Sequence, residues 1–142
     1  MYLKSYGGDD GPHGVPGFVT INRYQVLLNP DSQGFILVRL DDDCSVKEKK
    51  TYDTKLSIQA SRNMTDYLKS LPNNTRIAGI TYDEYNHRLS DSTKAELRFL
   101  GLNMTSTSWQ STLCFVFTKG KPHYTKQSQA KNGQGPSLFA LL

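Results

Sequence analysis

Two stretches of the chain are apolar at nearly every position, a pattern typical of strands that are covered on both faces. The first is residues 35–40, interrupted only by Arg39, and the second is residues 112–118. Because side chains alternate across a strand, each stretch presents apolar groups to both faces of its sheet. We therefore expect two central strands, lying next to each other, with a layer on each side.

Shorter patterns predict the remaining strands. The acidic turn at residues 41–43 reverses the chain into residues 46–52, whose lysines are typical of a sheet edge. Residues 17–28 have the alternation of a hairpin, and residues 75–82 have that of a further strand. Residues 1–16 and the polar stretch that follows the last strand contain no such pattern, so we expect both to be irregular.

Two segments change to the helical period of 3.6 residues. The first has an apolar face formed by Ala60, Met64, Tyr67, Leu68 and Leu71. Either Ser57 or Ser61 begins this helix, and Pro72 ends it. Ser90 begins a second, shorter helix, which Gly101 ends. The pattern as a whole predicts a β-rich α+β fold, and 142 residues are enough for one domain with a real core.

Composition and charge restrict the choice of partners. The net charge is +4, but the lysines are scattered and form no basic stripe, so we do not expect nucleic-acid binding. No window approaches the roughly 20 apolar residues of a membrane span, so we expect no membrane insertion. The N-terminus has no apolar signal segment, whereas the Asn-x-Thr sequons at Asn63, Asn73 and Asn103 favour secretion. The chain is therefore either cytosolic or a processed secreted form, and we expect the latter.

The chain has two cysteines, too few for a disulfide framework. Cys44 lies in the acidic turn, where we expect exposure, and Cys114 lies in a central strand, where we expect burial. A bond between them requires Cα atoms within about 7 Å. The alternatives are a link between two chains through Cys44, or two thiols that stay reduced.

No set of residues in the sequence is typical of catalysis. The three histidines are far apart and have no metal-ligand spacing, and the acidic turn lacks the pattern of a calcium loop. Asp83 and Glu84 are adjacent, so on a strand they point apart, whereas a glycosidase needs two carboxyl groups facing across a bond. There is no Gly-rich phosphate loop and no nucleophile elbow. We expect a protein that is not an enzyme and has no cofactor or metal.

A series of short motifs, in this order, resembles the interleukin-like EMT inducer domain, also called the PANDER-like domain. The motifs include Gln33-Gly34-Phe35, Tyr52-Asp53-Thr54, Asp66-Tyr67-Leu68, Thr81-Tyr82-Asp83-Glu84, Trp109 and Lys119-Gly120. The resemblance covers residues 17–121, leaving an irregular segment at residues 1–16 and a C-terminal extension at residues 122–142. It implies two antiparallel sheets packed face to face, with two short flanking helices.

The resemblance implies two kinds of function. Domains of this family occur in small secreted cytokine-like proteins and in the stem of protein O-mannose N-acetylglucosaminyltransferase, which binds sugar without catalysis. In that stem the sugar lies among two arginines and an aspartate. The aspartate corresponds to Asp83 here, whereas Gln33 and Gln110 stand at the two arginine positions.

These residue types remain suited to a sugar, because a carboxylate accepts from adjacent hydroxyls and an amide both donates and accepts. Tyr85 or Trp109 offers a ring on which the apolar face of a sugar can pack. The structural alternatives are that Trp109 lies in the core and that Asp83 satisfies a turn. The candidate carbohydrate site comprises Gln33, Asp83, Glu84, Tyr85, Trp109 and Gln110.

We therefore expect a lectin-like protein that binds glycans. A single shallow sugar site is weak, so we also expect a homo-oligomer, assembled through Cys44 or through the apolar residues 138–142. The alternative is a secreted cytokine-like or protein-interaction domain.

Overall fold

The computed structural model describes residues 2–5, 17–21, 24–27, 34–43, 45–82, 85–104, 112–130 and 137–140. Residues before 34 and after 130 are described in their backbone alone. The elements are β1 (Tyr2–Ser5), β2 (Gly17–Ile21), β3 (Tyr24–Leu27), β4 (Gly34–Leu40), β5 (Val46–Tyr52), α1 (Ile58–Ser70), β6 (Arg76–Tyr82), α2 (Asp91–Phe99), β7 (Thr112–Thr118), the 3₁₀ turn η1 (Pro122–Tyr124), β8 (Lys126–Ala130) and β9 (Ser137–Ala140).

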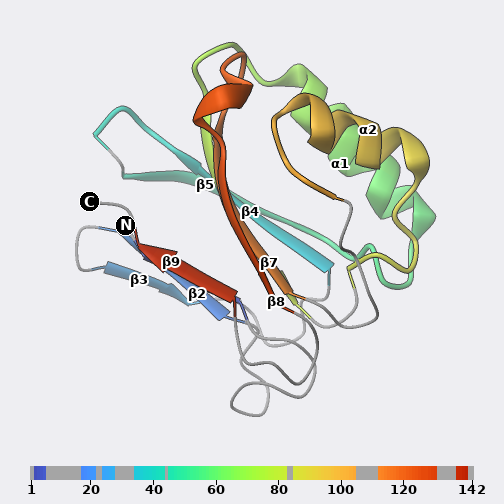
Figure 1. The fold of residues 1–142 in the computed structure, drawn as a ribbon, viewed down its shortest axis with the longest axis horizontal. Coiled ribbons are helices and arrows are strands. Elements are labelled where there is room, and N and C mark those ends of the chain that lie inside the picture. The colour runs from blue at the N-terminus through green and yellow to red at the C-terminus, as the bar shows by residue number, and fades with distance from the viewer. Residues whose placement is uncertain are drawn as a thin grey trace.

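A five-stranded antiparallel sheet, in the order β5-β4-β6-β7-β8, forms the centre of the fold (Figure 1). The side chains of β4 from Phe35 to Val38 are at most 1% exposed, so the prediction of a strand covered on both faces is confirmed. The predicted pairing of β4 with β7 is wrong, because β6 lies between them. Leu37 of β4 lies opposite Gly79 of β6, which in turn lies opposite Phe115 of β7.

Helices α1 and α2 cover one face of this sheet (Figure 1). Ser57 is the N-cap of α1, where its side chain accepts a hydrogen bond from the Ala60 N–H, and Ser90 caps α2 in the same way through Thr93. The core between helices and sheet is formed mainly by Phe35, Leu37, Met64, Leu68, Leu71, Ile77, Leu97, Leu100, Leu113, Phe115 and Phe117.

Between the two helices lies a cluster of four hydroxyl-bearing residues, Ser61, Thr65, Ser90 and Thr93. The hydroxyl of Thr93 is at its centre, 2.7 Å from each of the other three hydroxyl oxygens. Ser61 also accepts from the Ser90 N–H at 3.0 Å. Because these groups satisfy one another, the helices meet through a buried polar contact without an unpaired hydroxyl.

A second antiparallel sheet has the order β3-β2-β1-β9 and joins the two ends of the chain. It lies on the side of the central sheet opposite the helices, with β1 close to β6 and β7 (Figure 1). The central-sheet residues Ile36, Val38 and Ile80, which point away from the helices, are each 0% exposed. The class is therefore a mostly antiparallel α+β fold with two helices, as predicted, whereas side-chain packing between the two sheets stays a prediction.

Two predicted irregular regions contain strands. β1 lies within residues 1–16, and β8 lies within the polar stretch after residue 121. β8 is an edge strand whose side chains Gln127 and Gln129 both donate to the Asn103 carbonyl at 3.0 Å. Such a strand is held by backbone pairing and polar contacts, so it lacks the apolar alternation by which strands are recognised. In the described part of the chain, neither helix is long and apolar enough to cross a bilayer.

The close contact of β6 and β7 generates the first testable prediction. A Cβ added at Gly79 would clash with the ring of Phe115, so Gly79→Ala should lower the free energy of unfolding by about 1–3 kcal/mol. Urea denaturation measures this change. In the Gly79→Ala background, Phe115→Leu should restore part of the lost stability, because the shorter side chain relieves the clash. Strictly additive losses would contradict this explanation.

Candidate functional site

The described strand residues nearest in sequence to the predicted sugar-binding residues lie at one end of the central sheet, which we call the rim. At the rim, Gly34 at the start of β4 lies opposite Tyr82 at the end of β6. β7 begins close by at Thr112, two residues before Cys114, which lies opposite Ile80. Five of the predicted residues lie outside the described part of the chain: Gln33, Asp83, Glu84, Trp109 and Gln110.

The described residues beneath the rim are held in place by short-range contacts. Gly34 has a φ of 91°, and a Cβ there would clash with the carbonyl of Tyr52, so only glycine fits. The hydroxyl of Thr54 donates to the Tyr85 carbonyl at 2.6 Å. The hydroxyl of Thr81 accepts from the backbone N–H of Leu113 at 2.9 Å. These contacts therefore fix the backbone positions at which the strands reach the rim.

Tyr85 is the one predicted sugar-binding residue that the structure describes, and it lies in the core. Its side chain is 1% exposed, and its ring packs edge-on against Phe35 with ring centroids 5.2 Å apart. The expectation that Tyr85 offers a sugar platform is wrong, because a ring that is covered on all sides has no free face. Cys114 is likewise buried, as predicted, while Cys44 lies outside the described residues.

The opposite end of the sheet has an open polar hollow of about 270 Å³. One wall is the turn between β4 and β5, and the other is the segment between α1 and β6. The hollow is lined by Arg39, Leu40, Asp41, Asp42, Lys47, Pro72, Asn73, Asn74 and Thr75. The hollow was not predicted, although the antiparallel pairing of β4 with β6 brings the two polar segments at 41–43 and 72–75 to one end of the sheet.

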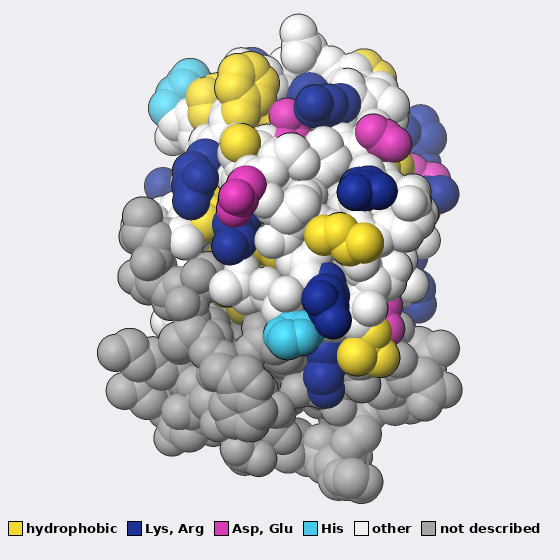
Figure 2. Space-filling view, turned by 90° about the vertical axis from the view of Figure 1, so that its right-hand side faces the viewer, with side chains coloured by type: hydrophobic (Ala, Val, Ile, Leu, Met, Phe, Trp, Pro, Cys, Tyr) yellow, Lys and Arg dark blue, Asp and Glu magenta, His cyan; other side chains and the backbone are white. Residues whose placement is uncertain are grey.

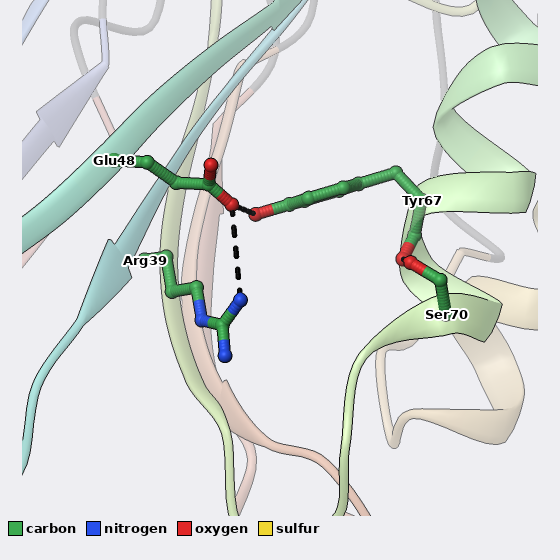
Figure 3. Close-up of polar contacts among 4 residues, drawn as sticks. All are labelled: Arg39, Glu48, Tyr67 and Ser70. Carbon is green, nitrogen blue, oxygen red and sulfur yellow. Dashed lines mark hydrogen bonds and ion pairs between the residues drawn. The ribbon is translucent and has the colours of Figure 1, made fainter.

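A polar cluster joins α1 to the outer strand β5 on the helix side of the sheet (Figure 3). The Tyr67 hydroxyl donates to Glu48 at 2.6 Å, and Arg39 lies 3.9 Å from the same carboxylate. The rings of Tyr67 and Tyr52 lie 6.2 Å apart. Partial burial, reinforced by Glu48, raises the pKa of Tyr52 to about 12 and raises that of Tyr67 as well.

The hydrogen bond between Tyr67 and Glu48 connects α1 to β5 and has a structural role. A phenol with a raised pKa keeps its proton at neutral pH, so Tyr67 acts as a hydrogen-bond donor and not as a nucleophile or base. Among the described residues, no three of His, Cys, Asp and Glu are grouped to hold a metal ion. On the helix side, exposed hydrophobic side chains are interspersed with charged ones, and some of them lie together beside a histidine at the upper left (Figure 2).

The described molecule is thus a layered α+β domain with a fixed rim at one end of its sheet and a polar hollow at the other. The profile of the interleukin-like EMT inducer family matches residues 33–121, which is more than half of the chain. The chain therefore belongs to the interleukin-like EMT inducer family, and the resemblance noted in the sequence is confirmed. A comparison with curated protein sequences found no match.

The tyrosine cluster generates a prediction for alkaline pH. Because the folded chain holds the phenol protons of Tyr52 and Tyr67 more tightly than the unfolded chain does, their contribution to stability is complete below pH 10. It is lost as the pH rises from about 10 towards 12. Urea denaturation should show a steeper loss over this interval for the wild type than for the Tyr52→Phe,Tyr67→Phe double variant.

Ser70→Ala is the matched control for this experiment. The Ser70 hydroxyl donates to the Tyr67 carbonyl at 2.7 Å and does not touch the phenol (Figure 3). This variant should keep the wild-type pH dependence. Equal pH dependence of stability in the wild type and the double variant would contradict the assignment.

At pH 7, Tyr67→Phe alone should lower the free energy of unfolding by about 1 kcal/mol, because it removes the hydrogen bond to Glu48.

Proposed function

We propose that this chain is a non-catalytic, lectin-like carbohydrate-binding protein that holds a sugar at the rim. The observation that carries the proposal is the register of β4 with β6. Gly34 lies opposite Tyr82, so the residues next to them in the sequence, Gln33 and Asp83, leave adjacent strands at the same end of the sheet. Gln110 precedes the next strand, β7, at this end.

The chemistry of these side chains supports the proposal. The Asp83 carboxylate accepts hydrogen bonds from two neighbouring sugar hydroxyls, while the amides of Gln33 and Gln110 each donate and accept. Two amides in place of two arginines remove the charge-assisted contacts to an anionic sugar. The site therefore suits a neutral sugar, with Trp109 as the ring against its apolar face and Glu84 as a further acceptor.

A screen on a glycan array tests the proposal. The wild type should bind a subset of glycans, and Asp83→Ala should lose that binding, because the variant removes the central acceptor. The control is Asp66→Ala, which removes an exposed carboxylate from α1 and should bind as the wild type does. Absence of binding by the wild type, or unchanged binding by Asp83→Ala, would overturn the proposal.

The family description favours a second candidate, a secreted cytokine-like or protein-interaction domain. Agglutination of red cells separates the two candidates, because simple sugars inhibit agglutination by a lectin but not by an interaction domain.

Both candidates are secreted proteins, and the three sequon asparagines Asn63, Asn73 and Asn103 are all exposed. They are accessible to glycosylation in a secretory pathway.

We further propose that the chain forms a homo-oligomer, because several weak sites acting together raise the avidity for a cell surface. Light scattering coupled to size exclusion should give a mass above that of one chain. A non-reducing gel then distinguishes assembly through a Cys44 disulfide, which Cys44→Ser abolishes, from assembly through residues 138–142. A monomer at all concentrations would contradict this proposal without affecting sugar binding.

A further inference from the structure

We propose that the polar hollow at the far end of the sheet is a second binding site, which takes one ring of a neutral saccharide. This inference rests on the proposed function and extends it to a second site. When Asn73 carries no glycan, the hollow offers two carboxylates, two amides and two cationic groups around one space: Asp41, Asp42, Asn73, Asn74, Arg39 and Lys47. Its volume of about 270 Å³ is slightly below the range of roughly 300–1,000 Å³ for drug-sized ligands, so it suits a small one.

The balance of charge around the hollow selects a neutral ligand. Asp41 and Asp42 repel a phosphate or sulfate group, while Arg39 and Lys47 repel a metal ion. A saccharide hydroxyl donates to a carboxylate and accepts from a cation, and it does both with an amide. A neutral polyol therefore suits lining groups of either charge, whereas an ion of either sign is opposed by half of the charged ones.

The wall formed by the turn between β4 and β5 is held before any ligand arrives. The Asp41 N–H donates to the Ser45 carbonyl at 2.9 Å, and the Ser45 hydroxyl lies 3.4 Å from the Asp41 carboxylate. The Ser45 N–H also donates to the Asp43 carboxylate at 2.9 Å, closing the turn. Arg39 is oriented by Glu48.

The opposite wall is equally fixed. Asn74 has a φ of 73°, and its N–H donates to the Lys119 carbonyl at 2.8 Å. The Thr75 N–H donates to the Pro72 carbonyl at 3.2 Å. Pro72, which is exposed, adds apolar surface against which the C–H groups of a pyranose ring can pack. Because both walls are ordered already, a small ligand loses little affinity to ordering of the protein.

The hollow and the rim lie at opposite ends of the central sheet, so two bound saccharides would be well separated. The rim lies at the Gly34 end of β4 and the hollow at the Leu40 end. Six steps of about 3.3 Å separate these residues by about 20 Å. One chain would then hold two saccharides facing opposite ways, so it could link two glycans even as a monomer.

An NMR titration tests the inference residue by residue. The ¹⁵N-labelled chain is made in bacteria, so that Asn73, which belongs to a sequon, carries no glycan. Galactose, glucose and N-acetylglucosamine are each titrated to about 50 mM, well beyond the millimolar range of a weak single site. The amide signals of Asp41, Asp42, Asn73 and Asn74 should shift and saturate with at least one of them. Unchanged signals throughout would overturn the inference.

Two variants test whether the shifts report on the hollow itself. Asn74→Gly removes the side-chain amide but tolerates the positive φ, and Asp42→Ala removes an exposed carboxylate. Each should weaken binding at the hollow about fivefold or more, the effect of one lost hydrogen bond. Asp66→Ala is the control and should leave the affinity unchanged. Equal affinities for the wild type and both hollow variants would overturn the inference.

The same titration separates this inference from the proposed function. Binding that is confined to the rim and lost in Asp83→Ala would overturn the second site and leave the proposed function standing. Binding at the hollow that survives Asp83→Ala would support the second site, whether or not the rim binds. Spectra without any saturable shift would overturn both proposals.

Discussion

The side chains of β4 are buried on both faces of the central sheet, so two separate layers must cover them. On one face, Phe35 and Leu37 pack beneath the helices. On the other, Ile36 and Val38 are each 0% exposed, and the second sheet lies on that side of the central sheet (Figure 1). The helices follow β4 in the sequence, whereas the second sheet combines β2 and β3, which precede β4, with β1 and β9 from the two ends of the chain. Burial of this one strand thus requires nearly the whole chain to fold together.

A sheet covered on both faces has only its edges and the ends of its strands open to ligands. The outer strand β5 bears Lys47, Lys49 and Lys50, which discourage pairing with another chain. The ends of the central strands remain, and there the backbone turns and polar residues collect. The rim and the hollow are the two ends of the same pair of strands, β4 and β6. The layered architecture therefore leaves these ends as the places for the recognition proposed above.

The sequence predicted the elements whose pattern is set by burial. β4 and β7 are apolar on both faces, and α1 has a clear helical stripe, so their positions follow from periodicity alone. β8 was missed, because an edge strand is held by backbone pairing that leaves no pattern in the side chains. β1 was missed although it pairs with both β2 and β9, because its four residues are too few for an alternation to be recognised. The predicted strand order, with β4 next to β7, was also wrong. β6 lies between them, but its small residues Ala78 and Gly79 weaken the apolar pattern by which a buried strand is recognised.

Only the part of the candidate site that lies next to strand ends could be predicted from the sequence. That Gly34 and Tyr82, which adjoin Gln33 and Asp83 in the sequence, lie at one end of the sheet follows from strand pairing, but the orientation of Tyr85 does not. Two residues beyond Asp83, the chain turns Tyr85 inward against Phe35, and periodicity has no means of predicting the direction of a side chain in a turn. Burial of this ring closes the core directly beneath the rim. Of the two rings considered for the proposed sugar site, Tyr85 and Trp109, only Trp109 therefore stays a candidate for an aromatic contact.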